Sequence, residues 1–107
     1  PGGEVVLASA GHPSPFLAGV AWEVPPGLPL GVTVEATYEE AAARLAPGEQ
    51  LVLVSDGVVE AENSLRELFG FERTRELSMN SATEIAEAAL AWGQTDDITV
   101  VTVRRRT

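Results

Sequence analysis

The 107-residue sequence contains no lysine, no cysteine and only one histidine. The absence of lysine excludes a P-loop, a Schiff-base enzyme and a complete phospho-acceptor receiver site, because each needs a lysine at the phosphate or cofactor. The absence of cysteine excludes disulfides, thiolate zinc sites and a cysteine nucleophile. A single histidine cannot form a multi-histidine metal site or a phosphohistidine relay. Catalysis is therefore limited to carboxylates, hydroxyls, arginine and bound metal.

The chain is also poor in positive charge. Sixteen acidic residues against seven arginines give a net charge of -9 and a pI near 4.4. This balance argues against a nucleic-acid partner, because nucleic-acid affinity comes largely from basic residues that release counterions. The sequence has no long apolar run, so we expect no membrane span and no secretory signal, and a cytoplasmic location. A chain of this length forms one domain at most and has room for one core.

Apolar runs bounded by glycine and proline predict strands. Residues 4–9 form one such run, and residues 16–20 resume it after a link at 10–15, which indicates a hairpin. Residues 22–30 contain prolines typical of a surface loop. Residues 33–45 are ambiguous between helix and strand, and we favour a strand that turns at 46–48. The strongest strand signals are the continuous Leu-Val-Leu-Val within 50–55, typical of a strand buried on both faces, and the β-branched run at 98–103.

Two capping boxes predict helix starts. Ser64 with Glu67 and Ser81 with Glu84 match the Ser-x-x-Glu pattern, in which a hydroxyl and a carboxylate satisfy free amides of the first turn. After Ser81, apolar residues recur with helical spacing from Ile85 to Trp92, and Gly93 is placed to end the helix. We expect this apolar stripe to lie on the sheet.

Acidic residues stand at the ends of two apolar strands. Asp56-Gly57 follows the run at 50–55, and Asp96-Asp97 precedes the run at 98–103. Each pair alone is equally well explained as ordinary turn chemistry. If the two strands are antiparallel neighbours, however, the exit of one lies beside the entry of the other, and the carboxylates face a common point. Such a point attracts magnesium or manganese, which prefer oxygen ligands and activate water for attack on phosphate.

His12 lies between Gly11 and Pro13 at a strand-to-turn junction. It could contact substrate or donate a proton to a leaving alkoxide. The alternative, which we favour, is that it holds the turn by hydrogen bonding to the backbone. His12 is therefore a secondary candidate, not a member of the catalytic set.

Four motifs in register across nearly the whole chain carry a family resemblance. They are Ala-Ser-Ala-Gly-His-Pro-Ser-Pro-Phe-Leu at 8–17, Gly-Leu-Pro-Leu-Gly-Val at 27–32, Leu-Val-Leu-Val-Ser-Asp-Gly-Val-Val-Glu-Ala-Glu-Asn at 51–63, and Asp-Asp-Ile-Thr-Val-Val at 96–101. With these motifs the chain closely resembles the C-terminal half of the bacterial SpoIIE-type phosphatases, a branch of the metal-dependent type 2C (PPM) serine/threonine protein phosphatases. Residues 1–107 would then be the C-terminal portion of a single phosphatase domain.

The resemblance implies an α/β (α+β) fold, a layered sandwich of antiparallel sheets flanked by helices, with a binuclear manganese or magnesium site in the cleft. By this match Asp56 and Asp96 look like metal ligands, Gly57 belongs to the same motif, and Asp97 shapes the loop. Family members typically remove phosphate from serine or threonine on small regulatory proteins of the anti-anti-sigma type in bacterial stress or sporulation signalling. A phosphoprotein partner is therefore implied.

The chain departs from the family pattern in one respect. The family's first metal-binding motif, an Asp-Gly or Asp-Val-Ser-Gly-His-Gly-like segment, supplies the aspartate that bridges both ions, and this sequence has nothing like it. We therefore do not expect full catalysis from these residues alone. The alternative function is a catalytically incomplete regulatory or interaction module. A partial domain with an exposed sheet edge also favours a homodimer in either case.

Overall fold

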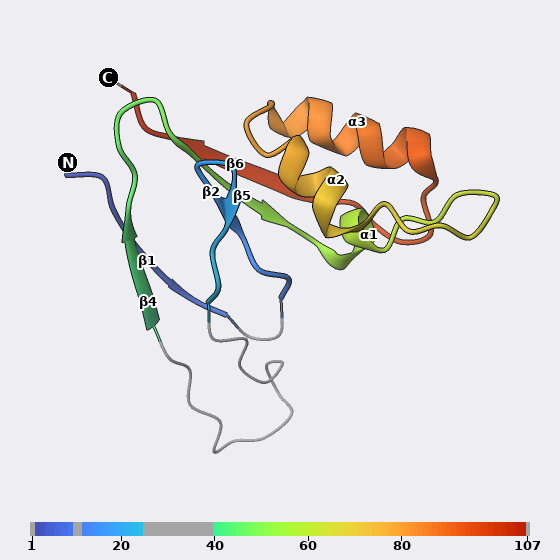
Figure 1. Cartoon of the computed structure of the whole chain (residues 1–107), viewed down its shortest axis with the longest axis horizontal. Helices are drawn as coiled ribbons and strands as arrows, with labels where there is room; N and C mark the ends of the chain where they lie inside the picture. The colour runs from blue at the N-terminus through green and yellow to red at the C-terminus, as the bar shows by residue number, and fades with distance from the viewer. Residues whose placement is uncertain (1, 10–11, 25–39, 107) are drawn as a thin grey trace, which may run out of the picture.

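The computed structural model describes residues 2–9, 12–24 and 40–106. Within them the chain forms two antiparallel sheets and three helices (Figure 1). The predicted loop at 22–30 and the first part of the predicted strand at 33–45 lie mostly outside the described residues. The elements in chain order are β1 (Glu4–Ala8), β2 (Phe16–Leu17), β3 (Val20–Ala21), β4 (Glu40–Arg44), β5 (Gln50–Val54), α1 (Asp56–Val59), α2 (Gly70–Glu76), α3 (Ala82–Trp92) and β6 (Val100–Arg104).

The short sheet consists of β1 and β4, which pair antiparallel with Val6 opposite Ala42. Both strands are confirmed, but the predicted hairpin between residues 4–9 and 16–20 is wrong. Instead, β2 forms a hairpin with β3, because Ala18 and Gly19 both adopt positive φ (52° and 83°) and make a two-residue turn. The first predicted strand therefore belongs to a different sheet from the second.

The longer sheet has the order β3-β2-β5-β6. Its central strand β5 is confirmed as buried on both faces, with Val52 fully inaccessible. A turn at 46–49 connects β4 to β5, with Gly48 at φ 84° and the Glu49 amide donating to the Ala46 carbonyl at 3.0 Å. This turn does not make a hairpin, since β4 and β5 pair in separate sheets. It carries the chain from one sheet to the other.

The β6 strand pairs antiparallel with β5, with Val54 opposite Val100. The run at 98–103 is β-branched on both faces, but only one face of β6 is covered. Val101 and Val103 are 46% and 47% exposed, because β6 is the last strand of the sheet and the helices cover only the other face. On that covered face, Val52, Val54 and Val100 pack toward Ile85 and Ala89 of α3.

The helix predicted after Ser81 is confirmed. Ser81 accepts a hydrogen bond from the Glu84 amide, and the Glu84 carboxylate accepts one from the Ser81 amide, which completes the capping box. The helix ends at Gly93, whose φ of 151° brings the backbone so close to Glu62 that a Cβ atom would overlap the Glu62 carbonyl. The apolar stripe that begins at Ile85 forms the helix side of the core, as expected.

The helix predicted after Ser64 is wrong. The side-chain oxygen of Asn63 accepts hydrogen bonds from the amides of Leu65 and Glu67 at 3.0 and 2.9 Å. These bonds replace the ones that the predicted Ser64 cap would make. Arg66 then adopts a positive φ of 62°, which an α-helix cannot contain. The segment closes as a loop, and α2 begins only at Gly70.

Candidate functional site

A cavity of about 330 Å³ lies where β5 ends and β6 begins. Asp56 is the first residue of α1, directly after β5, and Asp96 and Asp97 precede β6. Because β5 and β6 are antiparallel neighbours, these acids meet at one end of the sheet, as the sequence predicted. All three carboxylate residues are exposed. The cavity is lined by His12, Pro13, Ser55, Asp56, Gly57, Asp96, Asp97 and Thr99.

Gly57 allows the two acidic segments to approach each other. A Cβ atom at this position would overlap the backbone oxygen of Asp97 and would lie 3.3 Å from the backbone oxygen of Asp96. Gly57 is itself buried. Glycine is required here because a neighbouring backbone occupies the space of a side chain, and not because the φ angle is unusual. The Asp-Gly pair therefore combines an exposed carboxylate with the close contact that brings the second acidic segment beside it.

Ser55 joins the two strand ends through both its backbone and its side chain. Its amide donates to the Thr99 carbonyl at 3.0 Å, and its hydroxyl accepts from the Thr99 amide at 2.9 Å. The same hydroxyl lies 3.3 Å from the Asp97 carbonyl, to which it donates. Asp96 adds a local contact, since its carboxylate accepts from the Asp97 amide at 2.8 Å. These bonds hold the loop at 96–99 in place beside Asp56.

Ser55 and Thr99 were not among the predicted site residues. The sequence did contain an indication of their role. Each of them lies close to an acidic motif, at the end of one of two strands that we expected to pair. Hydroxyl residues at such positions can bridge the strand ends through backbone amides. The pairing itself had to be known before this role could be assigned.

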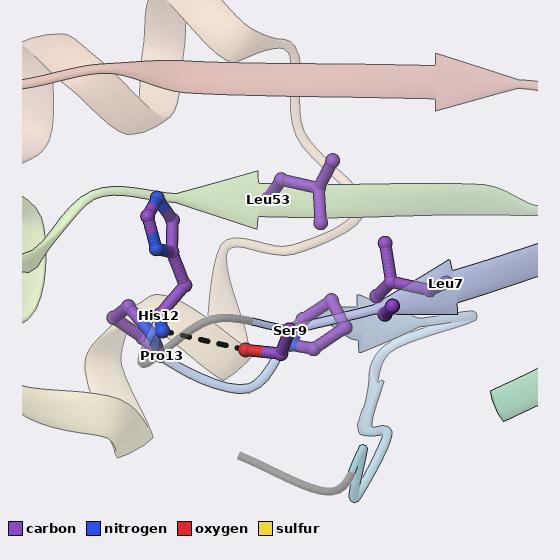
Figure 2. A pocket seen from close by; sticks show the side chains of 7 residues that line it. Leu7, Ser9, His12, Pro13 and Leu53 are labelled. Atoms are coloured by element: carbon purple, nitrogen blue, oxygen red, sulfur yellow. Dashed lines mark hydrogen bonds between the residues drawn. The ribbon is translucent and has the colours of Figure 1, made fainter. Parts of the chain in front are cut away.

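His12 reaches the site from the link between β1 and β2. Its backbone amide donates to the Ser9 hydroxyl at 3.3 Å. This bond does not involve the imidazole, so the turn-holding role of the His12 side chain stays a prediction. Figure 2 shows the imidazole ring extending from its loop toward the end of β5. The ring thus lines the acidic cavity in addition to its place in the turn. The loop that follows β1 therefore contributes one wall of the site.

The residues around the acidic cavity have the chemistry of a hard-cation site. Carboxylate, hydroxyl and carbonyl oxygens line it, and these are the ligands that magnesium and manganese prefer. In the described part of the chain, however, no three histidine, cysteine or acidic side chains gather closely enough to form a metal centre by themselves. The donors fit such an ion, and these residues would supply only part of its coordination shell.

The family model described as Stage II sporulation protein E (SpoIIE) matches residues 1–106 of the chain. The chain belongs to the SpoIIE family. A search of curated proteins finds no match. In the described residues, no helix is long and apolar enough to cross a membrane.

Solved structures share the fold of this SpoIIE-family chain. The RsbU and RsbW domains of a Mycobacterium tuberculosis protein match 98% of it with a TM-score of 0.74 and 24% identity. The SiaA-PP2C domain of Pseudomonas aeruginosa matches 96% with a TM-score of 0.67 and 23% identity. The manganese-presoaked phosphatase domain of SpoIIE from Bacillus subtilis matches 97% with a TM-score of 0.63 and 24% identity. The fold is therefore that of PP2C-type phosphatase domains.

The SpoIIE-family chain is shorter than these neighbours. It spans 33%, 47% and 51% of the three matched chains, respectively. The similarity therefore extends over nearly all of this chain and over a third to a half of each neighbour.

Proposed function

We propose that this SpoIIE-family chain is part of a metal-dependent phosphatase that hydrolyses phosphoserine or phosphothreonine on a regulatory protein. The observation that supports it best is the meeting of Asp56 and Asp96 in one cavity, at the ends of neighbouring strands. Family membership and the PP2C fold agree with this chemistry. The manganese presoak of one neighbour supports a divalent cation as cofactor.

In this proposal Asp56 and Asp96 hold manganese or magnesium through their carboxylate oxygens. When bound, the ion supplies positive charge for the phosphoryl group and lowers the pKa of water. Ser55 positions the loop at 96–99, and Gly57 sets its distance from Asp56. Asp97 contributes its backbone to this arrangement, and His12 lines the same cavity.

The proposed substrates are phosphorylated signalling proteins of the anti-anti-sigma type, in the cytoplasm. One neighbour combines RsbU and RsbW domains in a single structure, and another is a cell fate determinant. These descriptions belong to those proteins, and they support a signalling role for a chain of the same fold.

The test is phosphate release from a phosphoserine peptide by the full-length protein, measured over a manganese titration. We expect Asp56→Asn and Asp96→Asn each to lower kcat/KM by about 100-fold or more, because even changes outside the ligand set of a metal site cost about 10- to 100-fold. Glu87→Gln is the matched control, since it makes the same change of acid to amide at an exposed position of α3. Unchanged rates in both aspartate variants would show that the cavity is not the catalytic site.

A second candidate function is a catalytically incomplete PPM-like regulatory or interaction module. It is favoured by the absence, in the described residues, of a three-ligand metal group. In that case the full-length protein would bind a partner without releasing phosphate at any manganese concentration. The same titration, followed by calorimetry for manganese binding, distinguishes the two functions.

A further inference from the structure

The two acidic segments that meet in the cavity stay side by side beyond it. One is the outgoing segment, residues 55–67, which contains Asp56 and α1, and the other is the returning segment, residues 92–99, which contains Asp96 and connects α3 to β6 (Figure 1). Contacts join positions 55 with 99, 57 with 97, 60 with 95, 62 with 93, and 67 with 92. The two segments are therefore antiparallel, with the two acids near one end of the pair and Trp92 at the other.

The Trp92 side chain anchors the end of the pair that lies away from the cavity. Trp92 is the last residue of α3, and its indole nitrogen donates to the Glu67 carbonyl at 2.7 Å. The Arg73 guanidinium lies 4.0 Å from the ring centroid, and Phe69 meets the ring edge-on with centroids 6.0 Å apart. These neighbours hold the indole, so the start of the returning segment is fixed to the outgoing one.

Two further contacts lead from this end toward the acids. Gly93 has a φ of 151° and lies so close to the Glu62 carbonyl that no side chain fits between them. The Thr95 hydroxyl donates to the Glu60 carbonyl at 3.4 Å. Glu60 in turn donates its amide to the Asp56 carbonyl at 2.8 Å. The residue directly before one acid is thus linked to the helix that begins with the other.

We propose that Trp92 is a positioning residue for Asp96. This inference rests on the proposed function, in which Asp56 and Asp96 hold the same ion. By fixing the start of the returning segment, the bond to Glu67 limits how far the Asp96 carboxylate can move from Asp56. Ligands that are ordered before the ion arrives bind it more tightly, because less freedom is lost on binding. Trp92 does not line the cavity and acts through the backbone of the returning segment.

Trp92→Phe in the full-length protein tests this role. The substitution removes the indole N–H but keeps an aromatic ring against Arg73 and Phe69. We expect the manganese Kd, measured by calorimetry, to rise about 10-fold, the lower end of the range for residues outside the ligand set of a metal site. We expect kcat at saturating manganese to stay close to wild type, since the bound ion restores the arrangement. Trp22→Phe is the matched control, because it makes the same change after β3 and outside both segments, and we expect its Kd to be unchanged.

Hydrogen exchange in the metal-free protein separates positioning from a general effect on stability. In Trp92→Phe we expect exchange in residues 93–99 to become about 5-fold faster, the change expected for the loss of one hydrogen bond. We expect exchange in β5 to stay the same, because this central strand reports opening of the core. Equal acceleration in both regions, with an unchanged manganese Kd, would show that Trp92 only stabilises the core and would overturn the proposal.

Thr95→Val is a second variant that leaves the core intact. Thr95 is exposed, and valine keeps its shape but removes the hydroxyl that donates to Glu60. We expect a smaller rise in the manganese Kd than in Trp92→Phe, and no rise in Thr95→Ser, which keeps the hydroxyl. An unchanged Kd in both Thr95→Val and Trp92→Phe would overturn the proposal.

The same measurements distinguish this inference from the proposed function. If the wild-type protein bound no manganese and released no phosphate, the phosphatase proposal would fail. Faster exchange confined to residues 93–99 in Trp92→Phe would then still support the positioning of Asp96, whereas unchanged exchange would overturn it too. If all variants released phosphate with the same manganese dependence, the positioning role would be overturned and the phosphatase would stand.

Discussion

The geometry of the acidic cavity depends on a residue without a side chain as well as on the residues that carry carboxylates. Gly57 has no side chain, and the backbone of Asp97 occupies the space where one would lie. Asp56 can therefore share a cavity with Asp96, although the two are far apart in the sequence. The carboxylates provide the chemistry, and the glycine determines how closely they approach.

Gly57→Ala tests this role. The added methyl group has to displace the backbone at Asp97, so we expect a loss of about 1–3 kcal/mol in the free energy of unfolding, together with weaker manganese binding. Denaturant unfolding and calorimetry measure the two effects. Gly2→Ala is the control, because its Cβ would make only ordinary contacts at 3.6 Å, and we expect a change within about 0.5 kcal/mol. Equal effects of the two substitutions would contradict the close-approach argument.

At the scale of elements, helix α3 has the strongest local determinants in the chain. Its capping box is complete, and the hydrogen bonds from the Ser81 backbone and hydroxyl lower the pKa of Glu84 below its ordinary value. The ionised form of Glu84 is thus favoured in the folded state. Its contribution to stability is complete above the ordinary pKa of the unfolded chain and is lost as the pH falls through the lower pKa of the folded chain.

Ser81→Ala removes the cap. We expect a decrease of about 1 kcal/mol in the free energy of unfolding at pH 7, the usual effect of losing a serine cap. We also expect the acid-induced loss of stability to become smaller in the variant, because the backbone amide at position 81 still lowers the pKa of Glu84 but the contribution of the Ser81 hydroxyl is gone. Urea unfolding between pH 7 and about pH 3 spans the ordinary carboxyl pKa and measures both effects.

Thr83→Ala is the control for this variant. Thr83 is exposed in the first turn of the same helix but takes no part in the capping box, so we expect a change within about 0.5 kcal/mol. If Ser81→Ala were no less stable than Thr83→Ala at pH 7, the box would be dispensable.

The helices and strands also show which parts of the fold could be predicted from the sequence. The strands β1, β5 and β6 and the helix α3 were predicted, because local patterns of burial and capping encode them. The meeting of Asp56 with Asp96 was predicted only on the condition that β5 and β6 pair as antiparallel neighbours, which they do. The same Ser-x-x-Glu pattern failed at Ser64, where Asn63 offers the amides a competing acceptor. Pattern alone does not decide between two local hydrogen-bonding arrangements.

Strand pairing was less predictable than the strands themselves. The Ala18-Gly19 turn and the turn at 46–49 look equally suited to hairpins in the sequence, yet only the first joins paired strands. The difference depends on long-range contacts between β1 and β4. A cavity of about 270 Å³ between Leu7 and Leu53 was not predicted for the same reason, because its walls come from segments that are far apart in the sequence.

At the scale of the whole molecule, the sheet and the helical layer are joined by polar contacts as well as by the apolar core. Gln50 is only 4% exposed, and its side-chain amide donates to the carbonyls of Ser78 and Asn80 at 2.9 and 2.7 Å. Arg104, directly opposite Gln50 on β6, donates to the Met79 carbonyl at 3.2 Å. The connection between α2 and α3 is thus fixed to the end of the sheet away from the acidic cavity.

Gln50→Leu tests this connection. It keeps a side chain of similar size but leaves two buried or partly buried carbonyls without their donor, so we expect a loss of about 1–3 kcal/mol in the free energy of unfolding. Gln94→Leu, at an exposed position after α3, makes the same substitution as a control, with an expected change within about 0.5 kcal/mol. Thermal unfolding of both variants provides the comparison, and equal midpoints would argue that the amide contributes nothing net.

The surroundings of Trp92 have a practical consequence. Its indole nitrogen donates to the Glu67 carbonyl at 2.7 Å, the Arg73 guanidinium lies 4.0 Å from its ring centroid, and Phe69 meets it edge-on with centroids 6.0 Å apart. The loop after α1, the start of α2 and the end of α3 therefore all converge on one fluorophore. Once Trp22 is replaced by phenylalanine, the intrinsic emission of the protein becomes an optical probe of whether these three segments are assembled.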